Sequence, residues 1–176
     1  MSRLRSVLFT AWMYGVTAGM GLLWLPSFLL PRRVLRDGMR LHARVIRWGL
    51  RAILGVRIEF RGVEHAPAGP ALVAAKHQGM LDTIAPFLAL EDPVIVLKRE
   101  LSRIPVYGWI AWKQRMIVVD REAGATALRR MVADARARTA DGRQLLIFPE
   151  GTRQPPGAPP DYKPGIAALY RELDLP

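Results

Sequence analysis

The chain has 176 residues, enough for one domain with a hydrophobic core, and its composition shows no disordered or low-complexity stretch. It contains no cysteine, which excludes disulfides, thiolate metal sites and a cysteine nucleophile. The formal net charge of +11 suggests nucleic-acid binding, but residues 1–51 hold nine arginines and one acid, and so +8 of that charge. The remaining 125 residues carry only +3.

The first predicted element is a membrane segment. Residues 7–30, VLFTAWMYGVTAGMGLLWLPSFLL, run for 24 residues without a charge, and a helix of this length crosses a hydrocarbon core of about 30 Å. A secretory signal peptide fits poorly, because the stretch is too long for an h-region and no small-residue cleavage site follows it. Arginines lie at both ends, so charge only slightly favours a cytoplasmic C-terminal side.

Residues 34–54 predict an amphipathic helix at the membrane surface, after Pro26 has interrupted the apolar run. Its arginines recur every three or four residues along one helical stripe: Arg36, Arg40, Arg44, Arg47 and Arg51. Most of its apolar residues lie on the other side, so the stripe would face anionic headgroups. Two arrangements fit: one span plus an interfacial helix, or a hairpin that dips into one leaflet and returns.

Two other interpretations of this segment are weaker. A buried soluble hairpin is disfavoured because long uncharged runs rarely stay soluble. RNA binding through the arginine stripe is disfavoured because Trp24 and Trp48 suit an interfacial aromatic belt better than a base-stacking platform. We therefore assign residues 1–54 to a membrane-associated two-helix segment and expect no nucleic-acid partner.

Residues 55–176 are predicted to form an α/β domain. The stretch VRIEFR, residues 56–61, alternates apolar and charged side chains as a half-exposed strand does. Four short apolar runs then predict strands; they start at Ala71, Val94, Met116 and Leu145. The stretches between these runs are long enough for helices, which is typical of α/β layering.

The end of the domain is predicted to be helical, with one long loop. Residues 125–139 repeat apolar side chains at helical spacing, and residues 166–173 predict a last helix. Between them, residues 153–165 hold five prolines and predict a loop. The expected fold class is α/β, a mixed central sheet flanked by helices and preceded by an N-terminal membrane-embedded helical hairpin.

The first candidate site is KHQGMLDT, residues 76–83. A histidine can act as a general base near neutral pH, and a carboxylate on its other ring nitrogen fixes the tautomer. Within one helix His77 and Asp82 would stand about 140° apart, so His77 is expected in a turn and Asp82 in a helix that begins near Met80. By itself this spacing would rather suit a capping or structural histidine.

Two further polar stretches follow predicted strands. FPEGTR, residues 148–153, places polar side chains beside a glycine at a strand's C-terminal end, where open α/β sheets form their sites. Arg153 is suited to clamp a phosphate with two parallel hydrogen bonds, and the alternative is a surface ion pair with Glu150. Lys98 and Arg99 follow another strand and would attract an anionic substrate; the alternative for Lys98 is a solvated lysine.

In their order and spacing these stretches resemble the glycerolipid acyltransferase family, and most closely its 1-acyl-glycerol-3-phosphate acyltransferases. The similarity runs from about Val56 to the end of the chain. His77 and Asp82 match the family's motif of histidine, four residues and aspartate, and residues 148–153 match its phosphate-site motif. The block between them is matched by Lys98, Leu101, Pro105 and Gly108.

The resemblance implies an acyl transfer that gives phosphatidic acid in phospholipid biosynthesis. His77 would remove the proton from the 2-hydroxyl of lysophosphatidate as that oxygen attacks the thioester of acyl-CoA or acyl-carrier protein. Asp82 would orient the ring, and no acyl-enzyme would form. No metal or other cofactor is expected.

The resemblance also assigns the binding residues. Arg153 would hold the substrate phosphate, helped by Lys98 and Arg121. The substrate-site loop would consist of Glu150, Gly151 and Thr152. The expected partners are lysophosphatidate, the acyl donor and the bilayer, and we expect a membrane location of the bacterial inner-membrane type with the active site facing the cytoplasm.

Two alternatives stay open. An acyltransferase for another lysolipid, such as lyso-ornithine lipid, would share every motif, and an inactive membrane-bound scaffold would show no effect of His77→Ala. A lipase or thioesterase fits poorly, because the sequence has neither a Gly-x-Ser-x-Gly elbow nor a cysteine. In the family another apolar strand usually follows the helix that here ends ALYRELDLP, so we expect the last part of the sheet to be missing.

Overall fold

The computed structural model describes residues 3–176, so the first two residues of the predicted segment 1–54 lie outside the described part. The chain begins with two long helices, α1 (Arg3–Leu23) and α2 (Arg32–Leu54), joined by the 3₁₀ helix η1 (Leu25–Leu29). The strands are β1 (Ala71–Ala74), β2 (Pro93–Lys98), β3 (Ile117–Val119) and β4 (Gln144–Ile147). The other α-helices are α3 (Pro86–Ala89), α4 (Tyr107–Lys113), α5 (Gly124–Ala140) and α6 (Pro164–Leu173), and the short 3₁₀ helices are η2 (Val63–His65), η3 (Met80–Thr83), η4 (Arg99–Arg103) and η5 (Arg121–Ala123).

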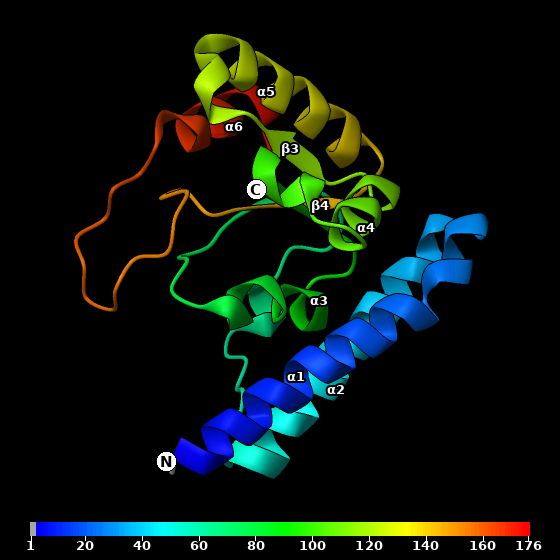
Figure 1. Ribbon diagram of the computed structural model, residues 1–176. Helices are drawn as coiled ribbons and strands as arrows, with labels where there is room; N and C mark the ends of the chain where they lie inside the picture. The colour runs from blue at the N-terminus through cyan, green and yellow to red at the C-terminus, as the bar shows by residue number, and fades with distance from the viewer. Residues whose placement is uncertain (1–2) are drawn as a thin grey trace.

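Helices α1 and α2 form an antiparallel hairpin (Figure 1). The Trp12 ring packs on Trp48, and Thr17 Oγ1 lies 3.1 Å from His42 Nε2. The later residue of α1, Thr17, contacts the earlier residue of α2, His42, so the two helices run in opposite directions. Within residues 3–176, α1 is the one helix long and apolar enough to cross a membrane, and none of its residues is buried. Which of the two membrane arrangements it adopts stays a prediction.

The sheet is four-stranded in the order β1-β4-β2-β3. The α/β class is confirmed, but every strand pairing in the described residues is parallel, whereas a mixed sheet was expected. The reason is that the connections between the strands carry helices, and parallel pairing follows from such crossovers. Strand β1 lies at one edge, where Leu72 N donates to the carbonyl oxygen of Pro176. The expectation that the last part of the sheet is missing stays a prediction.

The strand predicted at residues 56–61 is wrong, because this segment pairs with no strand of the described sheet. Its alternation of exposure is nevertheless real: Arg57, Glu59 and Arg61 are exposed, and the apolar residues between them are half-buried. The period-two pattern reports which side faces solvent, but a strand also needs a neighbour whose backbone groups it can bond.

Helices cover both faces of the sheet, α5 and α6 on one and α2, α3 and α4 on the other (Figure 1). On the first face Met131, Ala135 and Leu169 pack on Val94 and Leu145. On the second face the buried cluster comprises Ala43, Phe87, Ile95, Leu97, Ala111 and Leu146. Successive residues of β2 and β4 point to opposite faces, as a strand requires. Helix α2 therefore belongs to the core of the domain as well as to the hairpin.

The packing of α2 corrects the predicted role of its arginine stripe. Arg40 donates to the carbonyl oxygens of Leu90 and Glu91, at 3.0 and 2.5 Å, and Arg36 lies 3.9 Å from the Asp92 carboxylate. These two arginines bind the loop before β2 and do not face headgroups. The rest of the stripe, Arg44, Arg47 and Arg51, is exposed.

Gly108 permits the tight packing of α4 on η4. It is buried, and a Cβ placed on it would stand 2.0 Å from the carbonyl oxygen of Ser102, a backbone atom that cannot move independently. Gly108→Ala is therefore expected to lower the free energy of unfolding by roughly 2 kcal/mol, as overpacking does. Thermal unfolding in detergent measures the loss. Gly19→Ala is the control, since a Cβ there meets nothing within 4 Å; equal midpoints for both variants would contradict the prediction.

Candidate active site

The predicted site residues all follow the carboxyl ends of the strands. His77 lies three residues after β1, residues 150–153 follow β4, Lys98 ends β2, and Arg121 comes soon after β3. Because the four strands are parallel, these ends lie at one edge of the sheet. The structure thus brings to one edge residues that are spread over almost eighty positions of the sequence.

His77 and Asp82 form a hydrogen-bonded pair. His77 lies in the turn after β1, Asp82 lies in η3, and His77 Nδ1 is 3.2 Å from Asp82 Oδ2. The prediction that the carboxylate reaches back to the ring is confirmed, and the predicted helix near Met80 is one turn of 3₁₀ helix. With Nδ1–H donated to the carboxylate, Nε2 is the ring nitrogen that can accept a proton.

Asp82 is held in its ionised form. Its Oδ2 also accepts hydrogen bonds from the backbone N–H groups of Gln78 and Gly79, at 2.5 and 2.7 Å. Partial burial acts to raise the pKa of Asp82, but the bonds from Gly79, Gln78 and His77 outweigh it, and the pKa lies below its ordinary value. A carboxylate fixed in this way can orient the imidazole and stabilise an imidazolium.

Two residues after β4 position His77 from its other sides. The Phe148 ring stacks on the imidazole, with the ring centroids 4.4 Å apart and the planes 24° from parallel. The backbone N–H of Gln154 donates to the carbonyl oxygen of His77 at 2.7 Å. The loop that carries Arg153 is therefore joined directly to the turn that carries the histidine.

Glu150 is not a surface residue. Its side chain is fully buried, and the nearest cation is Lys76, whose Nζ lies 3.7 Å from Oε1. Within residues 3–176 neither carboxylate oxygen accepts a hydrogen bond. The alternative of a surface ion pair between Glu150 and Arg153 is therefore wrong, since Glu150 pairs across the site with the residue next to His77.

Arg121 and Lys98 stand together beside the loop. Both line one small pocket, and Arg121 Nη2 donates to the carbonyl oxygen of Gly151 at 2.5 Å. Gly151 has φ +68°, a backbone conformation that favours glycine, and a Cβ there would lie 2.7 Å from Arg121 Nη2, so the arginine would also have to shift. Thr152 and Arg153 are exposed on the same loop, and no ion pair holds Arg153 in the described part of the chain.

Sequence reasoning did not assign site roles to Lys76, Phe148 or Gln154. Lys76 and Phe148 lie inside the stretches that were singled out, so their position beside His77 and Glu150 was an available signal. No local pattern marks Gln154, because its contact is made by the backbone. The described residues contain no group of three His, Asp or Glu side chains that could hold a metal ion.

The structure thus places a histidine with its carboxylate partner beside a loop and several cations at one edge of a parallel sheet, an arrangement that can accept a proton and attract an anion. Residues 57–176 match the model of the Acyltransferase family. The chain therefore belongs to the Acyltransferase family, a family of acyl-transferring enzymes.

Individual relatives agree with this assignment. The chain is 35% identical over 129 residues to the 1-acyl-sn-glycerol-3-phosphate acyltransferase of Pseudomonas aeruginosa, a match that covers 73% of this chain and 50% of the relative. It is 36% identical over 156 residues to the lyso-ornithine lipid O-acyltransferase of the same organism, covering 86% of this chain and 58% of the relative. The chain thus spans about half the length of these relatives.

The fold also matches a solved structure. The crystal structure of the 1-acyl-sn-glycerophosphate (LPA) acyltransferase PlsC from Thermotoga maritima superposes with a TM-score of 0.79 at 20% identity. The match covers 100% of this chain and 73% of that chain. At this identity the similarity confirms the fold, including its helices and parallel sheet.

Proposed function

We propose that the chain transfers a fatty acyl group from acyl-CoA or acyl-carrier protein to the 2-hydroxyl of lysophosphatidate, giving phosphatidic acid. The observation that carries the proposal is the His77–Asp82 pair, which lies at the same sheet edge as Lys98, Arg121 and Arg153. The named 1-acyl-sn-glycerol-3-phosphate acyltransferase relative supports the choice of substrate.

The proposed step is a direct transfer. Nε2 of His77 takes the hydroxyl proton as the oxygen attacks the thioester carbonyl, and the carbon–sulfur bond then breaks. The imidazolium returns the proton to the leaving thiolate, while Asp82 keeps the ring oriented. We propose that no metal takes part, so a chelator should leave the rate unchanged. The reaction takes place at a bilayer surface, in our proposal the cytoplasmic face of a bacterial inner membrane.

Lyso-ornithine lipid is a second candidate acceptor. The relative that acts on it aligns with more of this chain, 86% against 73%, at a similar identity. The test measures thiol release with each lysolipid as acceptor and with acyl-CoA and acyl-carrier protein as donors. Release that depends on lysophosphatidate supports the proposal, and release only with lyso-ornithine lipid would replace it.

A substitution of Arg153 tests the choice of lysophosphatidate as the acceptor. In our proposal its guanidinium binds the lysophosphatidate phosphate, and a charged hydrogen bond of this kind corresponds to a rise in KM on the order of 10- to 100-fold in Arg153→Ala. Arg153→Lys should recover part of the loss. Arg130→Ala is the matched control, because Arg130 is an exposed arginine on α5, which packs on a face of the sheet and carries none of the site residues. An unchanged KM for lysophosphatidate would contradict the role of Arg153.

A further inference from the structure

Helix α4 exposes two tryptophans that the proposed reaction does not use. Trp109 is 53% exposed and Trp112 is 76% exposed, and their spacing of three residues places them on one side of the helix. Ile104 and Tyr107, just before them, are also exposed. Large aromatic side chains in such a group mark an interaction surface.

Both ends of α4 contact the N-terminal hairpin. Val106, the residue before the helix, packs against α1, because a Cβ placed on Gly21 would stand 3.2 Å from Val106 Cγ1. At the other end Lys113 Nζ donates to the carbonyl oxygen of Phe28 at 2.8 Å. Helix α4 thus lies beside the end of α1 and the turn of the hairpin.

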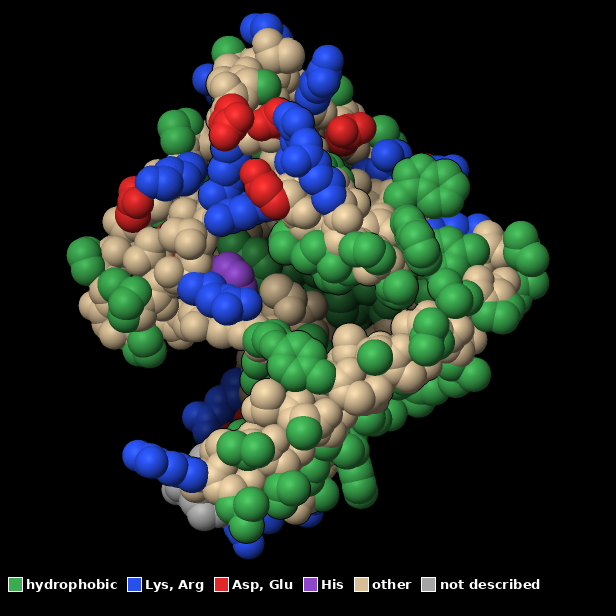
Figure 2. Space-filling view, viewed as in Figure 1, with side chains coloured by type: hydrophobic (Ala, Val, Ile, Leu, Met, Phe, Trp, Pro, Cys, Tyr) green, Lys and Arg blue, Asp and Glu red, His purple; other side chains and the backbone are tan. Residues whose placement is uncertain are grey.

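The neighbouring part of the hairpin is equally apolar and exposed. Leu29 is 92% exposed, and Leu22, Leu23 and Leu30 are exposed as well. Figure 2 shows apolar side chains gathered on the side of the molecule where the hairpin meets the domain. The α4 tryptophans therefore continue the surface of the helix that is long and apolar enough to enter a bilayer.

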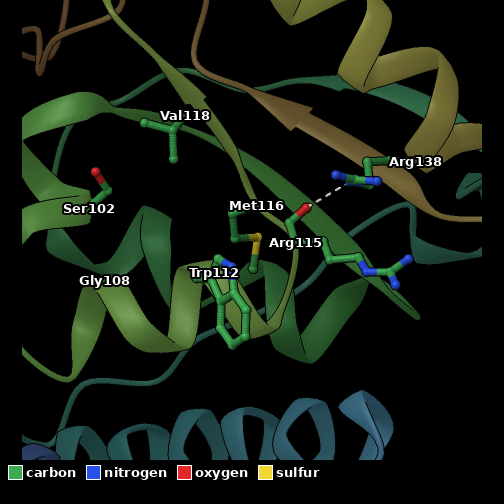
Figure 3. A pocket seen from close by; sticks show the side chains of 7 residues that line it. All are labelled: Ser102, Gly108, Trp112, Arg115, Met116, Val118 and Arg138. Atoms are coloured by element: carbon green, nitrogen blue, oxygen red, sulfur yellow. Dashed lines mark hydrogen bonds between the residues drawn. The ribbon is translucent and has the colours of Figure 1, made fainter.

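Two arginines lie at the border of this apolar surface. Trp112 lines a pocket with Met116, Arg115 and Arg138. Figure 3 shows the two arginines at one side of this pocket, with Met116 and Trp112 next to them. Tryptophan beside arginine is typical of side chains at the boundary between acyl chains and anionic headgroups.

We infer that Trp109 and Trp112 contact the lipid bilayer, so that α4, the end of α1 and the hairpin turn form one lipid-contacting surface. The inference rests on the proposed function, because it explains how a domain that acts on a lysolipid is held against the membrane. The α/β domain then has its own membrane contact, which both ends of α4 join to the hairpin.

The absence of cysteine permits a site-specific test. The single variants Trp109→Cys and Trp112→Cys of the full chain are each labelled with an environment-sensitive fluorophore and bound to vesicles of phosphatidylethanolamine and phosphatidylglycerol. Leu22→Cys on α1 is the membrane reference, and Ala137→Cys, exposed on α5, is the aqueous reference. Quenchers carried on the acyl chains and iodide in the water report the position of each label.

The expected result is acyl-chain quenching at positions 109 and 112 close to that at 22 and several-fold above that at 137. Quenching at 22 alone would overturn the inference. Protection from iodide without acyl-chain quenching would also overturn it, because a second copy or another protein would then cover α4. Acylation of a short-chain, monomeric lysophosphatidate by the same variants shows separately whether the proposed function fails.

Discussion

His77→Ala is expected to lower kcat of the acyl transfer about 10²- to 10⁴-fold, the usual contribution of a general base. The reason is geometric: Nδ1 is engaged by Asp82 at 3.2 Å, so Nε2 is the proton acceptor that the substitution removes. Phe148 and the Gln154 backbone hold the ring and the turn, and neither can replace the imidazole. Thiol release with lysophosphatidate and acyl-CoA measures the loss.

The chain supplies a matched control in His65. This histidine is exposed and lies in η2, with its Nε2 3.6 Å from the carboxylate of the neighbouring Glu64, so His65→Ala should keep full activity. Asp82→Asn should fall between the two, because it removes the charge that orients the ring. Activity in His77→Ala equal to that in His65→Ala would contradict the mechanism and favour a scaffold. Unfolding measurements on both variants exclude a loss caused by misfolding.

Asp92→Ala is expected to lower the free energy of unfolding by about 3 kcal/mol, as the loss of one partner from a buried ion pair does. The Asp92 carboxylate accepts two hydrogen bonds from Arg32, at 2.8 and 2.6 Å, and lies 3.3 Å from Arg143 Nε. Arg143 is 2% exposed, and burial lowers its pKa to about 10. Without Asp92 this buried guanidinium would have no carboxylate partner within residues 3–176.

The same cluster ties the hairpin to the sheet, since Arg32 begins α2 and Asp92 precedes β2. Burial acts to raise the pKa of Asp92, but Arg32 and then Arg143 outweigh it, so the pKa lies below the ordinary 3.8. Because the folded state lowers this pKa, the stabilisation is complete above pH 3.8 and disappears as the pH falls through the folded value.

Denaturation of wild type and Asp92→Ala across this pH range checks both statements. Asp141→Ala is the control, because Asp141 is half exposed and its nearest cation, Arg115, is 3.9 Å away, so its loss should cost less than about 0.5 kcal/mol. Equal losses in the two variants would contradict the cluster's role. Asp92→Leu combined with Arg143→Met should recover part of the stability, since the buried Arg143 charge is removed with its partner while the part-exposed Arg32 still loses its carboxylate.

Several elements were predictable from local patterns. The four apolar runs are the four strands of the sheet, the helix predicted at residues 125–139 is α5, and the proline-rich loop precedes α6 as expected. Helical spacing, strand spacing and proline each act within a few residues, so one sequence suffices to detect them. The strand predicted at residues 56–61 failed because its pattern says nothing about a pairing partner.

The candidate site was predictable in its members but only partly in its contacts. The spacing of His77 and Asp82 was enough to place one in a turn and the other in the following helix, since five residues form a local geometry. The pairing of Glu150 with Lys76 was not predictable, because 74 positions separate them and only the packing of β1 against β4 brings them together.

The sequence by itself determined the membrane-compatible first helix, the α/β order of elements and the histidine–aspartate pair, because each depends on periodicity or spacing within one segment. Only the tertiary structure decided that Arg36 and Arg40 bind the protein rather than headgroups, and that α4 lies beside α1. The physical reason is that a residue's environment is set by the elements packed against it, and no local pattern specifies which distant element that will be.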